Sequence, residues 1–306
     1  MKGANMKKQE LKKALAQCIS DVREDMLLAP LSSFKIGGRC AIAAFPQNKD
    51  ELAYAVQSAR ALGIRYAVVG RASNLLFSDD GYDGMMIFTS HMSDVYNENG
   101  YIYASAGVNL GTIAMYAAKR SLSGFEFAFG IPGSLGGAVF MNAGAYGGEM
   151  KDVVAYSDYY DPETDSFGRF EGEAHSFSYR ESIYSKKEDL IIIGAALSLQ
   201  KGNEAEIRQK MDENMQKRRD KQPIEFPSAG SAFKRPKNGY ASQMIDECGL
   251  KGLSVGGAQV SEKHAGFIIN KDNATSKDVK ALMEEVKGRV FDRFGITLES
   301  EIRYMD

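Results

Sequence analysis

The stretch Gly130-Ile-Pro-Gly-Ser-Leu-Gly-Gly137 is the most informative part of this chain, because it begins a run to Gly148 in which seven of nineteen residues are glycine. Glycine lets backbone N–H groups approach a diphosphate without obstruction by a side chain. Pro132 stiffens the turn, and Ser134 adds a hydroxyl donor. The chain has neither GxGxxG followed by an acid nor GxxxxGK followed by Ser or Thr, which disfavours a Rossmann site and a P-loop. The alternative to a phosphate-binding loop is a set of tight turns between strands.

A second loop of this kind is Gly70-Arg-Ala-Ser-Asn-Leu-Leu76. It follows the apolar run Ile64–Val69, so it lies at the carboxyl end of a predicted strand, where parallel sheets place ligands. Ser73 and Asn74 offer side-chain donors, although both are also common turn residues. Two such loops favour a large phosphorylated cofactor.

The residues around these loops predict a mixture of strands and helices. An amphipathic helix is expected over residues 8–19. Strands over 41–45 and 64–69 flank a helix that begins after Asn48 and ends at Gly63. Such a strand–helix–strand unit usually pairs its strands in parallel. Further strands are expected over 85–88, 101–106 and 296–305, and further helices over 110–120, 204–219 and from Thr275 to Gly295.

The composition excludes several classes of protein. A chain of 306 residues with 44% hydrophobic content suits two or three domains. Three cysteines without CxxC spacing fit a reducing cytosol and disfavour a metal site. No apolar run reaches the ~18 residues of a membrane helix, and the polar segment 1–10 lacks the apolar core of a signal peptide. A net charge of -2, with both signs interspersed, gives no basic surface for nucleic acid.

Three polar residues outside the glycine loops are candidates for chemistry. Arg180, within Ser-Tyr-Arg-Glu-Ser, offers a fork of donors for a carboxylate, or is a solvated loop charge. Ser231 lies among small residues that expose its hydroxyl, or is an ordinary turn serine. Glu301 lies opposite Ile302 on the last predicted strand, as an active-site acid or a solvent-facing one.

Taken together, these segments resemble the UDP-N-acetylenolpyruvoylglucosamine reductase (MurB) family, in the subgroup without an extra tyrosine-bearing loop over the substrate. The likeness runs from about Leu31 to Arg303, and its strength is that nine motifs occur in the right order. The motifs are Ser33-Phe-Lys-Ile-Gly-Gly38, Ser73-Asn-Leu-Leu76 with Asp79-Asp-Gly81, Gly130–Gly137, Met141-Asn-Ala-Gly-Ala-Tyr-Gly-Gly148, Tyr179-Arg-Glu-Ser182, Ala229-Gly-Ser-Ala-Phe-Lys234, Cys248-Gly-Leu-Lys-Gly252, Gly257-Ala-Gln-Val-Ser-Glu-Lys-His264 and Leu298-Glu-Ser-Glu-Ile-Arg303.

The resemblance implies an α+β fold. It would combine an FAD-binding unit of the vanillyl-alcohol-oxidase (PCMH) type, made of two α+β subdomains, with a C-terminal α+β substrate domain. The expected borders are 1–88 and 89–203 for the two FAD subdomains and 204–306 for the substrate domain, with the last strand able to pack back on the FAD unit.

The resemblance also implies roles for single residues. Ser231 matches the proton donor, and Arg180 and Glu301 match the pair that holds and polarises the substrate carboxylate. Lys234 and His264 fall on the substrate side, with Arg180. The implied FAD contacts are Gly70, Arg71, Ala72, Ser73, Asn74, Ser134, Gly137, Gly144, Tyr146, Arg218 and Arg303.

The implied activity is NADPH-dependent reduction of UDP-N-acetylglucosamine enolpyruvate to UDP-N-acetylmuramate, a step in peptidoglycan precursor synthesis. The implied cofactor is non-covalent FAD, and the protein is expected to be a cytoplasmic monomer without membrane or nucleic-acid partners. The chain departs from the family pattern at two places. The loop that begins at Gly70 has fewer glycines than is usual in the family, and Arg235 stands where some members have asparagine, at the position implied to contact the substrate diphosphate. Two rival functions stay open: a sugar or alcohol oxidase of the same flavin fold, and a non-catalytic flavin module.

Overall fold

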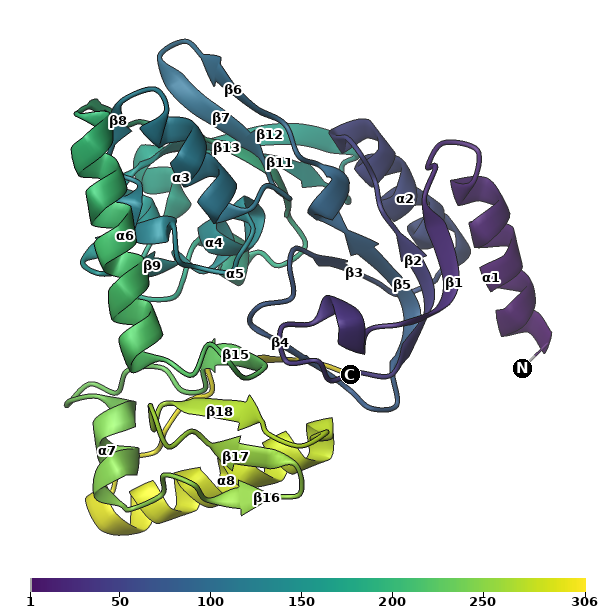
Figure 1. The fold of residues 1–306 in the computed structure, drawn as a ribbon. Coiled ribbons are helices and arrows are strands. Elements are labelled where there is room, and N and C mark those ends of the chain that lie inside the picture. The colour runs from purple at the N-terminus through teal and green to yellow at the C-terminus, as the bar shows by residue number, and fades with distance from the viewer. Residues whose placement is uncertain (1) are drawn as a thin grey trace. The chain divides into compact units, whose positions relative to one another are not determined.

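The computed structural model describes residues 2–306, and their contacts divide them into two compact units. The first unit contains the described residues up to Glu24, with Ala41–Arg71 and Gly84–Gln216. The second contains Asp25–Cys40, Ala72–Asp83 and Lys217–Asp306. Both units combine helices with a largely antiparallel sheet, which confirms the predicted α+β class (Figure 1). The expected border between two FAD subdomains stays a prediction.

The first unit contains most of a four-stranded sheet, with two helices packed against it. The strand order is β1 (Val22–Leu27), β2 (Arg39–Ala44), β5 (Tyr82–Phe88) and β3 (Tyr66–Val69). Helices α1 (Lys2–Leu15) and α2 (Lys49–Leu62) share a buried core with this sheet, and both lie beside it in Figure 1. The two strands that flank α2 are not neighbours: β5 lies between them and pairs with β3 in parallel. A direct parallel pairing of these two strands is therefore wrong, because β5 inserts between them.

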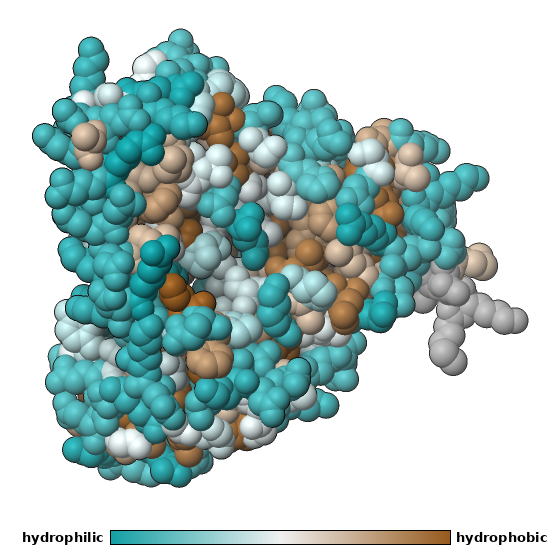
Figure 2. Space-filling model, in the orientation of Figure 1, coloured by the Kyte–Doolittle hydropathy of each residue, from teal (hydrophilic) through white to brown (hydrophobic). Residues whose placement is uncertain are grey.

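A second sheet in the same unit is antiparallel and has five strands. Its order is β12 (Ser166–Glu171), β11 (Val154–Asp161), β13 (Ile191–Leu197), β7 (Tyr101–Ser105) and β6 (Val95–Glu98). Helices α3 (Leu110–Ala118), α4 (Leu135–Phe140) and α6 (Glu204–Lys221) contribute apolar side chains to a core on one face of this sheet. The region of α6 is largely hydrophilic on the face drawn in Figure 2, since only Ile207, Met211 and Asn214 of that helix are buried.

The second unit is built from segments far apart in the sequence. Its four-stranded antiparallel sheet has the order β15 (Ser228–Ser231), β18 (Phe267–Asn270), β17 (Ala258–Val260) and β16 (Ser254–Val255). Helices α7 (Ala241–Glu247) and α8 (Ser276–Phe294) share its core, which also contains Phe34, Ile36 and Leu76 from the early part of the chain. In addition, β4 (Leu75–Phe77) pairs in parallel with the last strand, β19 (Arg303–Met305).

The remaining elements are short. They are the strands β8 (Leu122–Ser123), β9 (Gly144–Ala145), β10 (Gly148–Glu149) and β14 (Gln200–Lys201), the helix α5 (Ile183–Lys186), and the 3-10 turns Ala29–Leu31, Thr89–His91, Glu126–Ala128, Met150–Asp152 and Gly172–His175. Among the residues that the structure describes, no helix combines the length and the apolar character that crossing a membrane requires.

The predicted helix ends are confirmed where capping chemistry marks them. Asn48 Oδ1 accepts from the backbone N–H groups of Asp50 and Glu51, and Gly63 ends α2 in the left-handed conformation. Thr275 and Asp278 form a capping box at the start of α8, and Gly295 ends that helix. Asp79 also binds this helix start, accepting at 2.8 Å from the Ser276 backbone N–H.

Two predicted elements needed correction. The first helix ends at Leu15 rather than at residue 19, with Ile19 buried after it. The expected strand 296–305 shortens to β19, preceded by a single bridge between Ser300 and Phe233. The alternation of apolar residues is real at Leu298 and Ile302, which are buried. A strand needs a pairing partner as well as alternation, and most of this segment has only that one bridge.

Candidate active site

The two predicted phosphate loops meet inside the first unit. A Cβ atom added to Gly70 would lie 2.1 Å from Ser134 Oγ, so only glycine fits there without displacement. The bonds Leu135 N–H to Val108 O and Gly136 N–H to Ala106 O hold the second loop in place. Gly70 and Ser134 are 64 positions apart in the sequence, and the fold brings them into contact as expected for one binding site.

The side chain of Ser134 is buried without a hydrogen-bond partner among the described residues. Its side chain is 2% exposed, and it precedes α4 without capping that helix. Its Oγ has no hydrogen-bond partner within residues 2–306. A buried hydroxyl without a partner costs about 1–3 kcal/mol, so the site is built for a group that supplies one. Gly137 is exposed and close by, since its added Cβ would lie 3.6 Å from Ser134 Oγ.

Gly144 and Tyr146 lie in the hairpin of β9 and β10, which follows α4. A Cβ at Gly144 would lie 2.7 Å from Gly148 O, so the close approach of the two strands requires glycine. Tyr146 adopts φ 52° and is 41% exposed. The hairpin therefore presents an accessible backbone and one exposed aromatic ring.

Arg180 stands in a tight turn whose backbone is strained. The backbones of Ser178 and Glu181 bond to each other in both directions at 3.1 and 3.2 Å, and Arg180 between them has φ 59°. The left-handed conformation costs a non-glycine residue about 1–2 kcal/mol, so contacts around the turn must hold it. Arg180 is half-buried, and its guanidinium carbon lies 5.2 Å from the centre of the Tyr179 ring.

A buried hydrogen-bond network joins residues that lie on either side of Arg180 in the sequence. Ser157 Oγ lies 2.8 Å from His175 Nε2 and 2.7 Å from Tyr184 Oη, and all three residues are fully buried. His175 Nδ1 lies 3.0 Å from the carbonyl of Gly172, which can only accept. The proton of the neutral ring is therefore on Nδ1, and Ser157 donates to His175 while it accepts from Tyr184. Burial lowers the pKa of His175 and favours this neutral form.

Ser231 and Glu301 lie on adjacent segments of the second unit. The Glu301 backbone N–H donates to Ala232 O at 2.9 Å, and that of Lys234 donates to Glu299 O at 2.9 Å. Ser231 ends β15, and Ser231 and Glu301 are both half-buried. Lys234 Nζ is 3.5 Å from a carboxylate oxygen of Glu299.

The loop after Gly70 supports Glu301 from the other side. The side chain of Asn74 donates to Glu301 O at 2.9 Å, and the Arg303 backbone N–H donates to Asn74 O at 3.0 Å. Asn74 therefore binds the last segment of the chain as well as standing at a predicted cofactor loop. Ala72 is buried with φ 48°, a glycine-like conformation at a position where the sequence lacks glycine. Ser73 next to it is half-buried.

The remaining predicted residues are placed as follows. His264 packs edge-to-face on the ring of Phe267, the strand partner of Ser231, at 5.0 Å. Its Nδ1 accepts from the Gly266 N–H, and burial lowers its pKa, so the neutral ring keeps its proton on Nε2. Arg71 is exposed, and Arg218 is half-buried on α6.

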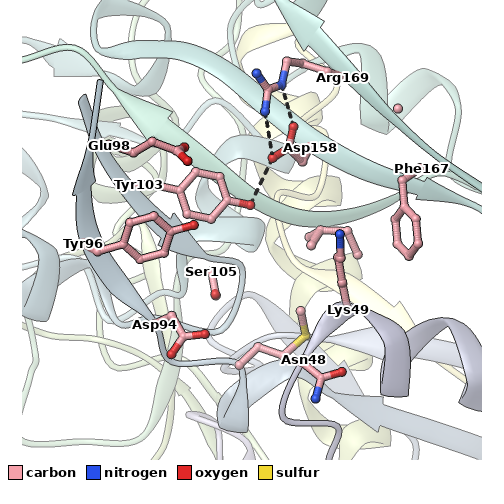
Figure 3. A pocket seen from close by; sticks show the side chains of 13 residues that line it. Asn48, Lys49, Asp94, Tyr96, Glu98, Tyr103, Ser105, Asp158, Phe167 and Arg169 are labelled. Atoms are coloured by element: carbon pink, nitrogen blue, oxygen red, sulfur yellow. Dashed lines mark hydrogen bonds and ion pairs between the residues drawn. The ribbon is translucent and has the colours of Figure 1, made fainter. Parts of the chain in front are cut away.

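A separate groove of about 600 Å³ lies in the first unit, on strands β6, β7, β11 and β12 and the start of α2. Figure 3 shows Tyr96, Tyr103, Glu98 and Asp94 in its lining, with Asp158 and Arg169 bound to each other beside Tyr103. Tyr103 donates to Asp158 at 3.1 Å. None of the predicted site residues lines this groove. Its size alone would make it a candidate ligand-binding site, but the charges of Asp158 and Arg169 already neutralise each other.

The two contacting loops and the mixed sheets define a flavin-binding protein. A model of an FAD binding domain matches residues 40–165. The solved structure of wild-type Phl p 4.0202, a glucose dehydrogenase, superposes with a TM-score of 0.50 at 14% identity, covering 63% of this chain and 44% of that one. At that identity the likeness shows the fold alone.

The C-terminal part narrows the class to one family. A model described as the C-terminal domain of UDP-N-acetylenolpyruvoylglucosamine reductase matches residues 222–305. The reductase of that name from Caldanaerobacter subterraneus is 47% identical over 272 residues, 89% of each chain. The one from Lachnoclostridium phytofermentans is 45% identical over 90% of each. The crystal structure from Thermus caldophilus has a TM-score of 0.79 at 33% identity, covering 94% of this chain and all of that one. The chain belongs to the UDP-N-acetylenolpyruvoylglucosamine reductase family.

Proposed function

We propose that this chain uses NADPH to reduce UDP-N-acetylglucosamine enolpyruvate to UDP-N-acetylmuramate, in peptidoglycan precursor synthesis. Family models match both the FAD-binding region and the C-terminal region of this chain. Proteins named UDP-N-acetylenolpyruvoylglucosamine reductase match this chain over about nine-tenths of its length and of their own. This is the single observation that carries the proposal. It favours the reductase over a sugar or alcohol oxidase, whose likeness is confined to the fold.

The chain's own residues fit a bound FAD. The unpartnered hydroxyl of Ser134 is a donor for a phosphate oxygen, and Gly70 leaves room beside it. The Gly144–Gly148 hairpin and the loop from Arg71 to Asn74 would complete the contacts, with Arg218 and Arg303 as further candidates. Bound FAD would supply the hydride-transfer chemistry between NADPH and the enolpyruvyl group. His175, one of three histidines in the chain, is fully buried and bonded to Ser157, which fits a cofactor that is not tethered through it.

Arg180, Ser231 and Glu301 are proposed to act on the substrate. Hydride addition to the terminal carbon of the enolpyruvyl group builds negative charge on its carboxylate, as in an enolate. A guanidinium with two N–H donors aimed at that carboxylate lowers the barrier. Glu301 can support the same charge only as a protonated donor, because an ionised carboxylate cannot donate. Ser231 would protonate the adjacent carbon, which is feasible because an enolate is a strong base. Lys234 and His264 are proposed to contact the sugar nucleotide.

Mixing the purified protein with NADPH and the enolpyruvyl sugar nucleotide, and following the nicotinamide absorbance, tests the proposal. The reductase consumes NADPH in repeated turnovers only when the enolpyruvyl sugar nucleotide is present, with one UDP-N-acetylmuramate formed per NADPH. An oxidase would instead consume oxygen with a sugar or alcohol, and a binding module would consume nothing. We further propose a monomer that works in the cytoplasm, and light scattering of the FAD-loaded protein tests the first of these statements.

A further inference from the structure

The turn that carries Arg180 is bonded to the end of one short helix at two points. Ser182 Oγ donates to the carbonyl of Phe140, the last residue of α4, at 2.7 Å. The side-chain amide of Asn142 donates to the carbonyl of Ser178 at 3.0 Å. These bonds reach the chain two residues after and two residues before Arg180, so they bracket it.

Three hydrogen bonds hold the side chain of Asn142 in this position. Its amide nitrogen also donates to a Glu149 carboxylate oxygen at 2.6 Å, and its Oδ1 accepts from the Lys151 backbone N–H at 2.9 Å. The residue is 1% exposed and adopts φ 44°, a left-handed conformation that asparagine tolerates better than most residues. One side chain therefore links the Arg180 turn to the segment that follows the Gly144–Gly148 hairpin.

The side chain of Ser182 is held in the same way. It is fully buried, and besides donating to Phe140 it accepts from the backbone N–H of Tyr184 as the N-cap of α5. The two bonds to the turn thus come from buried groups that have no water to replace them. Losing either would release a backbone that is already strained at Arg180.

The same helix begins at the cofactor loop. Ser134, the unpartnered hydroxyl, directly precedes α4, and the two bonds to the Arg180 turn lie at and just after its end. A six-residue helix is about 9 Å long, so it is a short and stiff spacer. The distance between the proposed FAD contact and the Arg180 turn is therefore set by α4 and these two bonds.

We propose that Asn142 and Ser182 are positioning residues that fix the Arg180 guanidinium relative to the bound flavin. The inference rests on the proposed function, because it gives Arg180 its role on the substrate. Neither residue needs to touch the substrate itself. A displacement of about 1 Å at a reacting group can reduce a rate by about 10²-fold, so the effect should appear only in the step that uses Arg180.

The test measures the two half-reactions separately, per bound flavin, in Asn142→Gly and Ser182→Ala. Glycine removes the Asn142 amide while accepting φ 44°. We expect NADPH to reduce the flavin within about twofold of the wild-type rate, and the enolpyruvyl substrate to reoxidise it about 10–10²-fold more slowly. Asn48→Gly is the matched control, because it also removes an asparagine that binds backbone N–H groups, at the start of α2. It should leave both rates unchanged.

The combination with Arg180→Lys distinguishes positioning from other effects. If Asn142 acts through Arg180, the double variant should be no slower than Arg180→Lys alone. Additive losses, or equal slowing of both half-reactions, would overturn the inference and leave Asn142 with a structural role. Suppose that flavin reoxidation is slow in Arg180→Lys but runs at the wild-type rate in Asn142→Gly and Ser182→Ala. That result would overturn the positioning role while the proposed function stands. A wild-type protein whose reduced flavin never reacts with the sugar nucleotide would overturn the proposed function instead. Ser182→Ala reaches the turn through a different bond, so it remains informative if Asn142→Gly does not bind FAD.

Discussion

The turn that carries Arg180 and the strand segments that carry Ser231 and Glu301 are held by different kinds of bonds. The turn that carries Arg180 is closed by its own backbone bonds, but the side chains of Asn142 and Ser182 tie it to the end of α4, and Arg180 itself is strained. The segments that carry Ser231 and Glu301 are joined to each other by backbone bonds, as from the Glu301 N–H to Ala232 O, and the Asn74 side chain also donates to the Glu301 carbonyl.

This difference determines how each region should respond to mutation. A substitution near Arg180 removes bonds that shape the turn, so it changes geometry as well as chemistry. Replacing the side chain of Ser231 or Glu301 leaves the backbone bonds in place, so its effect should report chemistry alone.

The largest effect is expected from Ser231→Ala. The variant should be reduced by NADPH at nearly the wild-type rate, because that step needs no proton on the sugar substrate. Reoxidation by the enolpyruvyl substrate should slow by about 10²–10⁴-fold, the usual contribution of a positioned general acid. Anaerobic stopped-flow of each half-reaction measures both. Parallel slowing would mean that Ser231 supports the flavin site, and no slowing would mean that another group delivers the proton.

Arg180→Lys should follow, with substrate reduction slowed by about 10²–10³-fold, the range found when one charge-stabilising donor is removed. Lysine keeps the charge but loses the planar fork that a carboxylate binds in two places. Steady-state kinetics with varied enolpyruvyl substrate give kcat and KM for the comparison. Turnover near the wild-type value would remove Arg180 from the site.

Gly70→Ala tests the contact between the two loops of the first unit. The added methyl would meet Ser134 Oγ at 2.1 Å, so the hydroxyl must move away from its place. We expect the Kd for FAD to rise at least about tenfold, equivalent to ~1.4 kcal/mol, as measured by fluorescence titration of the apoprotein. If the clash is the cause, adding Ser134→Ala should recover folding stability lost in Gly70→Ala. Unchanged FAD affinity would place the cofactor elsewhere.

A smaller difference is expected between two substitutions of Glu301. Glu301→Gln should retain more activity than Glu301→Ala, because an amide can still donate to developing enolate charge and a methyl group cannot. The backbone bond to Ala232 is available in both variants, so their stabilities should match. Thermal unfolding and turnover together make the test. Equal activities would assign Glu301 a structural role or one that depends on its charge.

The smallest effect is expected from the buried hydrogen-bond network of Ser157, His175 and Tyr184. Burial lowers the pKa of His175 in the folded protein, whereas the unfolded ring takes up a proton near its usual pKa of about 6.5. As the pH falls below that value, the unfolded state binds more protons, so the free energy of unfolding should decrease until the folded pKa is reached. Urea unfolding at several pH values should show less of this decrease in His175→Gln. Identical pH dependence in the two proteins would contradict the buried neutral ring.

The sequence could predict the parts of the fold that depend on local chemistry. Asn48, Gly63 and Thr275 mark helix ends through bonds to nearby backbone, and the structure has those ends. It also predicts that the loops that begin at Gly70 and Gly130 serve one cofactor, and Gly70 and Ser134 are in contact as that prediction requires. Their contacts with the cofactor stay a prediction. The family followed from the order of nine motifs, each too weak alone.

The sequence could not predict what depends on distant partners. The segment before Arg303 alternates like a strand, but pairing decides its length, and most of it has a single bridge. Asn142 belonged to a recognised motif without any sign that its amide binds a carbonyl thirty-six residues later. The chain of Ser157, His175 and Tyr184 likewise joins residues whose spacing carries no pattern.

The discontinuous second unit has a consequence for synthesis on the ribosome. Phe34, Ile36 and Leu76 belong to its core, and Asp79 binds the start of α8, yet most of that core comes from Lys217 onward. The first unit can acquire its own contacts while the polypeptide is still growing. Those early apolar side chains must wait, exposed on the nascent chain, until the last ninety residues emerge. At the usual elongation rate of about 5–20 residues per second, that wait lasts many seconds, during which a chaperone that binds short apolar segments would find its sites there.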